Sequence, residues 1–456
     1  MAPSSPPASE HSESPRPSPW TASRPKRGER GARGKARPRW RVWLGRLGKA
    51  FAVFLVAVIG LWIAIHRVVW LGPWLAEAGR SVFGTRFVAW VEDVAYGVQD
   101  RVDRWRYKDR PPRTFWSVPS GAAAARRAPS PSPSGQPTDG GAPADQGFLP
   151  KAYEPPFPEV ASDSDGIWVP VPDPREPERA VAMYKSMVHP DPRRGFGVLA
   201  VIAVDLKTYE LELAAGTTEP SSNSVFRSER PGLIPAQYVP RLVAAFNGGF
   251  RAAHGQYGMM LNGKEFLPPR DIACTLARYS DGSLRIGTWS TLKADVGSMT
   301  FYRQTPPCLV EDGDTHKALH YQEYAKGWGA TVDGETVIRR SAIGLDAERQ
   351  VLFYGVGDAM TAQAIARGMK AVGAYVAAEL DVNYSYPRFL LYGQKSSSEP
   401  PRATEALIPG IKFEPDEYVT RPCERDFFFL LRSEAHAEPA PTPVAPPPAT
   451  ASRPVL

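Results

Sequence analysis

The clearest candidates for catalysis are two acidic residues at the end of a predicted buried strand. Glu379 and Asp381 lie two positions apart. Residues two apart on a strand share one face, and the rise per residue places these side chains roughly 7 Å from each other. Carboxyl groups at about this separation suit glycoside hydrolysis, in which one protonates the leaving oxygen while the other assists attack on the sugar. The alternative is that one carboxylate caps a loop and the other pairs with an arginine.

A second candidate is the sequence Asn247, Gly248, Gly249 and Phe250, which follows a predicted strand over 242–246. Loops at strand ends often carry binding groups. The two glycines would let the backbone approach a ligand closely, and the asparagine amide can both donate and accept hydrogen bonds. The alternative is a turn that simply needs positive φ.

A third candidate is the pair Arg339 and Arg340 at the start of another predicted strand, before Ser341 and Gly344. The planar guanidinium group suits a phosphate or a carboxylate. Because neighbouring strand residues face opposite ways, we expect only one of the two arginines to face a site.

The remaining histidine and glycine patterns carry less information. His254, close to the Asn-Gly-Gly turn, is either a general base or a loop histidine without such a role. His316 and His320 have the spacing of two zinc ligands on a helix, but no third ligand is evident, so we predict no metal site. Gly355 and Gly357 lack the third glycine of a dinucleotide-binding loop, and the sequence identifies no cofactor.

The elements that must position these residues are mostly short strands joined by tight turns. Turn residues that tolerate positive φ occur at Asn262-Gly263, Asp281-Gly282 and Asp333-Gly334, each between two apolar runs. A buried strand over 351–356 is then followed by a helical pattern that ends at Gly373 and by another buried strand over 374–380. This order predicts an α/β or α+β domain with a mixed sheet of hairpins and a few helices.

The order of these motifs resembles the phosphodiester glycosidase family over approximately Phe196 to Tyr392. The resemblance rests on the Asn-Gly-Gly-Phe turn, the Leu-Asn-Gly and Ser-Asp-Gly hairpins, the sequence Arg-Ser-Ala-Ile-Gly, and a helix followed by Leu-Asp. It implies a mixed α/β domain that cleaves a sugar from a phosphodiester. Many bacterial relatives are extracytoplasmic and linked to surface polysaccharides, so the resemblance implies a glycan or glycosyl phosphodiester as the partner.

The resemblance also implies roles for individual residues. Arg340 matches the family's arginine and would hold the phosphate, while Asp381 matches its aspartate and would act as acid/base or nucleophile. Asn247, Gly248 and Gly249 match the family's turn, and the asparagine would orient one of these groups.

The chain departs from the family after Asp381. Glycines and then a serine usually follow there, whereas this chain has Val382, Asn383 and Tyr384 before its serine, and Glu379 replaces a neutral residue. Two interpretations follow. Either Glu379, Asn383 and Tyr384 line an altered substrate pocket, or the domain is an inactive module that binds a glycan or a protein.

Composition divides the chain of 456 residues, with its 48 prolines, into unequal parts. Segments rich in proline and small or polar residues bury too little apolar surface to fold. We predict a disordered basic arm, a transmembrane helix, an amphipathic helix, a linker, the glycosidase-like domain and a disordered tail. Their ranges are 1–49, 50–72, 80–108, 109–163, 164–432 and 433–456.

The segment from Ala50 to Ile65 has no charged residue and follows most of the excess positive charge of the chain, whose net charge is +7. Positive residues before an apolar span hold the N-terminus in the cytoplasm. We therefore expect a single-pass protein of the cell (inner) membrane with a periplasmic or otherwise extracytoplasmic C-terminal domain. The lipid bilayer is then a partner, and a nucleic acid is not.

Two features beyond this span leave alternatives open. The predicted helix over 80–108 has apolar residues at three- and four-residue spacing, so it would lie on the membrane, pack on the domain or self-associate. Cys274, Cys308 and Cys423 allow one disulfide and one free thiol, with a pairing that the sequence does not reveal.

Overall fold

The computed structural model describes residues 39–68, 71–118, 148–321, 326–329, 336–396 and 398–434. The chain forms two compact units, the first over Met1–Pro73 and the second over Trp74–Leu456. The described α-helices are α1 (Arg39–Arg67), α2 (Leu71–Phe83), α3 (Thr85–Tyr107), α5 (Trp289–Leu292) and α7 (Ala362–Ala371).

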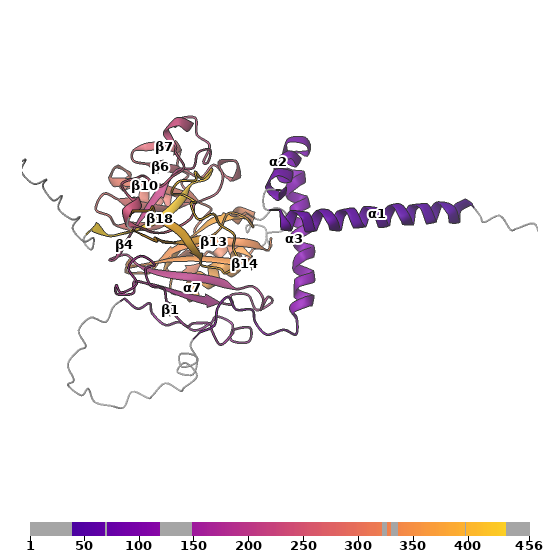
Figure 1. Cartoon of the computed structure of the whole chain (residues 1–456), viewed down its shortest axis with the longest axis horizontal. Helices are drawn as coiled ribbons and strands as arrows, with labels where there is room; N and C mark the ends of the chain where they lie inside the picture. The colour runs from indigo at the N-terminus through magenta and orange to yellow at the C-terminus, as the bar shows by residue number, and fades with distance from the viewer. Residues whose placement is uncertain are drawn as a thin grey trace, which may run out of the picture. The chain divides into compact units, whose positions relative to one another are not determined.

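The described strands form three sheets, which we name after one strand of each (Figure 1). The β13 sheet has the order β1-β2-β3-β14-β13-β15-β11-β12. Its strands are β1 (Val169–Pro170), β2 (Met183–Val188), β3 (Leu199–Asp205), β11 (Val310–Glu311), β12 (Asp314–Thr315), β13 (Ile338–Leu345), β14 (Val351–Met360) and β15 (Val376–Val382).

The other two sheets have five strands each. The β10 sheet has the order β7-β6-β10-β8-β9, with β6 (Met259–Leu261), β7 (Lys264–Leu267), β8 (Cys274–Tyr279), β9 (Leu284–Thr288) and β10 (Met299–Thr305). The β5 sheet has the order β17-β16-β5-β18-β4, with β4 (Tyr209–Ala214), β5 (Leu242–Asn247), β16 (Phe389–Gly393), β17 (Arg402–Ala406) and β18 (Phe427–Arg432).

The predicted α+β domain with a sheet-rich core and few helices is confirmed. Strand β13 pairs antiparallel with both β14 and β15, so these two strands run in the same direction on either side of it. Helix α7 connects them, and its N-cap is Thr361, whose side chain accepts a hydrogen bond from the Ala364 amide at 3.0 Å. It ends before Gly373, which has a φ of 103°.

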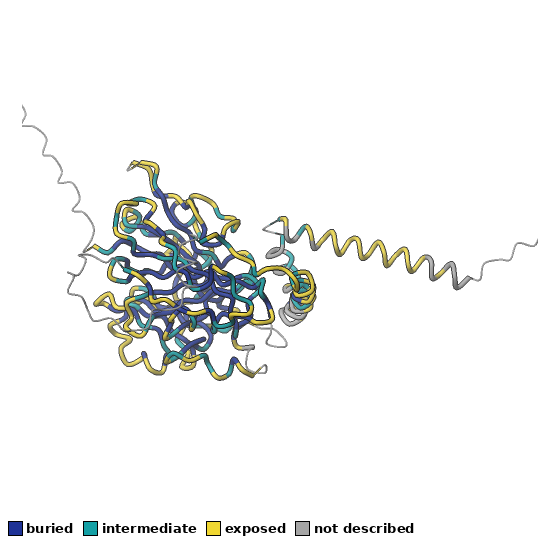
Figure 2. The backbone as a smooth tube through the Cα atoms, turned by 90° about the horizontal axis from the view of Figure 1, so that it is seen from below, coloured by how far each residue is buried: buried dark blue, intermediate teal, exposed yellow. Residues whose placement is uncertain are grey.

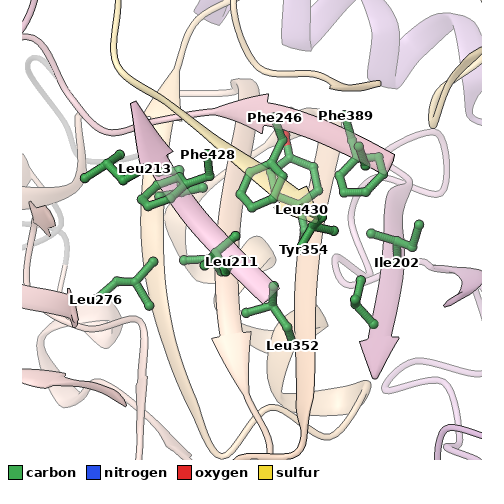
Figure 3. Close-up of a cluster of buried hydrophobic side chains, with 14 of the residues drawn as sticks. Ile202, Leu211, Leu213, Phe246, Leu276, Leu352, Tyr354, Phe389, Phe428 and Leu430 are labelled. Carbon is green, nitrogen blue, oxygen red and sulfur yellow. The ribbon is translucent and has the colours of Figure 1, made fainter. Parts of the chain in front are cut away.

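The largest hydrophobic core contains side chains from all three sheets (Figure 3). At its centre Phe246 of β5 stacks on Phe389 of β16 and Phe428 of β18, with ring centroids 5.6 and 5.5 Å apart. The Tyr354 ring of β14 lies 4.7 Å from the Phe246 ring and so joins the β13 sheet to the β5 sheet. In Figure 2 the buried residues lie in the interior of the domain, while many of the loops at its outside are exposed.

The predicted hairpin turns are present where the structure describes them. Asn262 and Gly263 have φ of 50° and 75° between β6 and β7, and Gly282 has φ of 84° between β8 and β9. The turn at Asp333 and Gly334 lies outside the described residues.

The N-terminal region is helical from Arg39, inside the range predicted as a disordered arm. The rest of the arm and nearly all of the predicted tail lie outside the described residues. Among the helices of the described chain, none combines the length and the apolar character that crossing a membrane requires.

Both ends of the predicted linker contact the domain. Phe115 and Trp116 pack partly against the main core, and the Tyr153 hydroxyl lies 2.7 Å from Ser186 Oγ. The proline- and glycine-rich centre of that range, residues 119–147, lies outside the described residues. The proline- and glycine-rich composition, averaged over the whole range, gave no indication that aromatic residues at its two ends pack on the domain.

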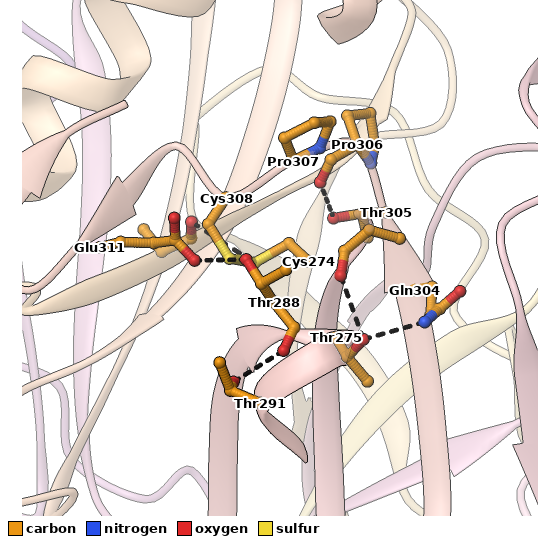
Figure 4. Close-up of a disulfide and its surroundings, with 12 residues drawn as sticks. Cys274, Thr275, Thr288, Thr291, Gln304, Thr305, Pro306, Pro307, Cys308 and Glu311 are labelled. Atoms are coloured by element: carbon orange, nitrogen blue, oxygen red, sulfur yellow. Dashed lines mark hydrogen bonds between the residues drawn. A yellow bond between two sulfur atoms is a disulfide. The ribbon is translucent and has the colours of Figure 1, made fainter. Parts of the chain in front are cut away.

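The cysteine pairing is Cys274 with Cys308, which leaves Cys423 as a free thiol (Figure 4). Cys274 begins β8, and Cys308 precedes Leu309, whose amide donates to Ala377 of β15 at 2.7 Å. The disulfide therefore links the β10 sheet to the edge of the β13 sheet.

Cys423 is expected to react slowly with alkylating reagents in the folded protein. Burial raises the pKa of its thiol to about 11, so little of the reactive thiolate exists at pH 8. Iodoacetamide labelling followed by mass spectrometry should show modification of Cys423 at least roughly tenfold slower than in guanidinium-unfolded protein. Equal rates in the two states would contradict the burial of this thiol.

Candidate active site

The predicted site residues meet where the β5 sheet and the β13 sheet come together. The Asp381 amide, near the end of β15, donates to the Gly248 carbonyl just beyond β5 at 3.1 Å. Ser341 of β13 donates to the Asp381 carbonyl at 2.9 Å and accepts a hydrogen bond from Asn247 Nδ2, also at 2.9 Å. Strand ends from two sheets therefore hold the backbone of Asp381 in place.

The carboxylate of Asp381 is bound through one of its two oxygens. Arg425 Nη1 lies 2.7 Å from Oδ2, and the Asn383 amide donates to the same oxygen. Among the described residues no hydrogen-bond partner contacts Oδ1, although the side chain is only 3% exposed. An ion-paired carboxylate with one uncommitted oxygen is the arrangement that a nucleophile or a base requires.

Arg425 precedes β18, the C-terminal strand of the described domain. Its guanidinium lies over the Tyr386 ring, 4.5 Å from the centroid, and its Nη2 donates to the Gly249 carbonyl at 3.3 Å. Burial by itself would lower the pKa of Arg425, but the neighbouring Asp381 carboxylate outweighs burial and raises that pKa. Arg425 is therefore a permanent positive charge beside Asp381.

A buried ion pair lies beneath the Asn-Gly-Gly turn. Arg303 of β10 donates through Nε to Asp426 Oδ2 at 2.8 Å, and both side chains are at most 1% exposed. The Gly249 amide donates to the same Asp426 oxygen at 2.9 Å. A Cβ at Gly248 would lie 2.2 Å from Asp426 Oδ2, and one at Gly249 would lie 2.8 Å from Arg303 Cζ. In this structure the space beside both glycines is filled by this ion pair.

Asn247 is fully buried, and both ends of its amide are bound. Its Oδ1 accepts from the Tyr354 hydroxyl at 2.7 Å and from the Arg388 amide at 3.3 Å. Its Nδ2 donates to Ser341, as described above, and to the Gly248 carbonyl at 3.1 Å. These contacts fix the turn that supports Asp381.

Arg340 and Glu379 form a second buried pair. Arg340 Nη1 lies 2.7 Å from Glu379 Oε1, and neither side chain is exposed. The Arg340 guanidinium also donates to the Met360 and Thr336 carbonyls, each at 3.0 Å. Glu379 Oε2 is buried without a hydrogen-bond partner among the described residues. The structure thus pairs Arg340, the predicted phosphate-binding arginine, with Glu379, whereas Arg425 forms the ion pair with Asp381.

Glu379 is expected to make the stability of the domain depend on pH. Burial raises its pKa to about 7, although Arg340 favours the carboxylate. The folded state then binds this proton more tightly than the unfolded state, so stability is greatest below the unfolded pKa and falls as pH rises towards 7, by up to about 3 kcal/mol.

Guanidinium unfolding at pH 5, 6 and 7 would measure this dependence, and Glu379→Gln should flatten it. Glutamine resembles the protonated carboxyl group, so the variant should be closest in stability to the wild type at pH 5. Parallel pH profiles for the wild type and the variant would contradict the elevated pKa.

Asn383 and Tyr384 occupy different surroundings. Asn383 Oδ1 accepts from the Ser385 and Tyr386 amides at 2.9 and 2.7 Å, which closes the turn after Asp381. Tyr384 instead lines a cavity of about 250 Å³ together with Tyr96 and Gln99 of α3 and Asp358 of β14. Burial raises the pKa of Tyr384 to about 12. Only Asn383 of the two contacts the Asp381 carboxylate.

The predicted histidines lie apart from these contacts. His254 is exposed in the short turn Ala252–His254. The Ala252 amide of this turn donates a hydrogen bond to the Glu219 carboxylate at 2.9 Å. His316 Nδ1 accepts from the Ala318 amide at 3.2 Å, and His320 Nε2 lies 3.3 Å from Thr315 Oγ1. Across the described part of the chain, no group of three or more potential metal ligands comes together.

Sequence reasoning missed Arg425, Asp426 and Arg303. Arg425 and Asp426 directly precede the apolar run of β18, so they occupy a strand start of the kind that was noted elsewhere. Arg303 lies inside β10 between Tyr302 and Gln304, and its charge gave no indication of complete burial.

Residues 240–382 match the family model of the phosphodiester glycosidases. The matched segment contains Asn247, Arg340, Glu379 and Asp381. The resemblance to the phosphodiester glycosidase family, predicted from the order of the motifs, is therefore confirmed over this segment.

Two solved structures resemble the chain. One is the catalytic domain of zebrafish N-acetylglucosamine-1-phosphodiester alpha-N-acetylglucosaminidase, auto-inhibited by its pro-peptide, at 14% identity and a TM-score of 0.36. It aligns over 62% of this chain and 96% of the zebrafish chain. The other is a hypothetical protein from Synechocystis, at 10% identity and a TM-score of 0.34, over 55% of this chain and 62% of that one. No curated protein matches.

Proposed function

We propose that the domain hydrolyses glycosyl phosphodiesters, with Asp381 as the nucleophile. The observation that carries the proposal is the binding of Asp381 through Oδ2 alone, which leaves Oδ1 for the substrate. The family match over residues 240–382 supports the substrate class.

The reaction needs few protein groups because its leaving group is a phosphate monoester. Asp381 Oδ1 attacks the anomeric carbon, and the bond from that carbon to the phosphate oxygen breaks with its electron pair on the oxygen. The second pKa of a phosphate monoester is about 6, so it departs without being protonated by an acid. Arg425 stabilises the departing charge. Water then cleaves the glycosyl ester, which yields the free sugar, the Asp381 carboxylate and one proton released to solvent.

A second candidate function is a binding module without catalysis. Asn383 places a side chain on the Asp381 carboxylate at a position where the resemblance implies glycine. Together with Arg425 it leaves the Asp381 side chain 3% exposed, so a substrate must displace one of the two. A module that recognises a glycan through the surrounding loops needs no such displacement.

The experiment that separates these functions is hydrolysis of a panel of glycosyl phosphodiesters by the full chain in ¹⁸O-labelled water. Cleavage at the anomeric carbon places the label in the sugar, whereas attack at phosphorus places it in the phosphate. A dialkyl phosphodiester without a sugar is the matched control substrate. Label in the sugar supports the proposal. Label in the phosphate, or glycan binding without turnover, overturns it.

We also propose that the chain is anchored in the cell membrane through the apolar segment 50–72, with the domain on the extracytoplasmic side and acting on envelope or surface polysaccharide. The concentration of basic residues before this segment supports the orientation. The Cys274–Cys308 disulfide supports an oxidising compartment. Protease added to spheroplasts should digest the domain, and protection of the domain until the membrane is lysed would contradict this topology.

A further inference from the structure

Helix α3 is attached to the domain by one face. Asp100 receives two hydrogen bonds from Arg194, from Nε at 2.7 Å and from Nη2 at 2.8 Å, and both side chains are buried. The rings of Tyr96 and Tyr107 lie 5.7 and 5.3 Å from Tyr384 and Phe196, respectively. A bidentate, buried ion pair with aromatic contacts at both ends fixes which side of α3 faces outwards.

The opposite face of α3 is apolar and exposed. We call it the valine stripe, and it consists of Phe87, Val91, Val94, Val98, Val102 and Trp105. The four valines are 44 to 51% exposed and Trp105 is 81% exposed, so these side chains are open to solvent along this face of α3. Residues at this spacing lie along one side of a helix, and the stripe is roughly 27 Å long at the rise per residue of a helix. Valine is a mediocre helix former, so local helix stability does not account for four exposed valines.

Basic residues accompany the C-terminal half of the stripe. Arg101, Arg106, Lys108 and Arg110 are exposed around Trp105, against the exposed carboxylate of Asp109. An apolar stripe with an aromatic residue at its end and flanking cations matches a helix that lies in the plane of an anionic membrane surface. Two copies packed stripe to stripe in parallel would instead bring these like charges together, which favours lipid as the occupant.

We propose that the valine stripe of α3 inserts into the interfacial region of an anionic bilayer and holds the domain against the membrane surface. The inference extends the membrane attachment proposed above, since only α2 separates α3 from α1 along the chain. Because Tyr96 of α3 contacts Tyr384, three residues after Asp381, the attachment also fixes the candidate active site at a set height above the lipid.

The test places a polarity-sensitive nitrobenzoxadiazole label on the full chain at V94C and, separately, at the exposed domain position E178C. The unsubstituted chain measures background labelling of Cys423. Each protein is reconstituted into vesicles of phosphatidylcholine with or without phosphatidylglycerol. We expect a blue-shifted, stronger emission from position 94 in the anionic vesicles, quenched by a lipid-borne quencher, and unchanged emission from position 178. The additional substitution V98E should abolish the shift.

The possible results separate this inference from the membrane anchor. A chain that floats with the vesicles but keeps a water-like emission at position 94 overturns the stripe's role and leaves the anchor intact. A blue shift that requires a high protein-to-lipid ratio, with V94C forming disulfide dimers, overturns it in favour of a second copy. A chain that does not float with either vesicle overturns both.

Discussion

Asp381→Asn is expected to abolish glycosyl phosphodiester hydrolysis, with a loss in kcat of roughly 10³- to 10⁶-fold, the range found when a nucleophile or its direct partner is removed. The substitution keeps the shape of the side chain and its contact with Asn383, but it replaces the attacking carboxylate by a neutral amide. Steady-state kinetics on the best substrate of the panel, with KM measured alongside, would show the effect.

The control for this loss is Asp271→Asn, which neutralises a 69% exposed carboxylate whose ion-pair partner is the surface lysine Lys293. It should leave kcat and KM unchanged, because exposed ion pairs contribute little. Asp271→Asn should unfold at the wild-type temperature, whereas Asp381→Asn should unfold at a lower temperature because Arg425 loses its charged partner, so circular dichroism must show that this variant is folded at the assay temperature. Retained turnover in folded Asp381→Asn would remove Asp381 from the mechanism.

Asp426→Ala is expected to destabilise the domain by about 3 to 5 kcal/mol, the usual cost of leaving one member of a buried ion pair without its partner. Arg303 would keep its hydrogen bonds to the Phe250, Tyr257 and Gln304 carbonyls but lose both oxygens of Asp426. The Gly249 amide would lose its acceptor as well. Chemical unfolding of the purified chain measures the difference directly.

A double variant distinguishes the cost of an unpaired charge from the value of the pair itself. Arg303→Met with Asp426→Leu removes both charges and retains most of the volume, so it should recover a large part of the stability lost in Asp426→Ala. If the double variant were no more stable than Asp426→Ala, the unpaired charge of Arg303 would not be the cause of the loss and our estimate would be wrong.

The local elements of the fold could be predicted from the sequence because their signals are local. Asn262-Gly263 and Asp281-Gly282 specify hairpins through backbone conformations that few other residues adopt, and Gly373 ends α7 in the same way. The assignment of strands to three sheets could not be predicted. Strand β18 lies between β5 and β4, although about two hundred residues of sequence separate β18 from these two strands. No local pattern encodes such a pairing.

Part of the candidate site could also be predicted from local sequence signals. Asp381 and Asn247 follow apolar strands, and that position identified them. Their partners are distant in sequence, so arginines could not be assigned to carboxylates. Arg340 pairs with Glu379, and Arg425 pairs with Asp381. The spacing of the residues in the sequence does not determine which carboxylate Arg340 binds.

The position of β18 has a consequence for biosynthesis. The strand is hydrogen-bonded on both sides and brings Arg425 to Asp381, yet it comes from the last part of the described chain. The ribosome synthesises β5 and β15 before it reaches this strand. Until then β5 and β4 of the nascent domain lack the strand that pairs with both of them. Termination after β17 and before Arg425 would therefore leave every earlier strand present and the Asp381 carboxylate without its guanidinium, so the site forms only after the segment that leads into β18 has been translated.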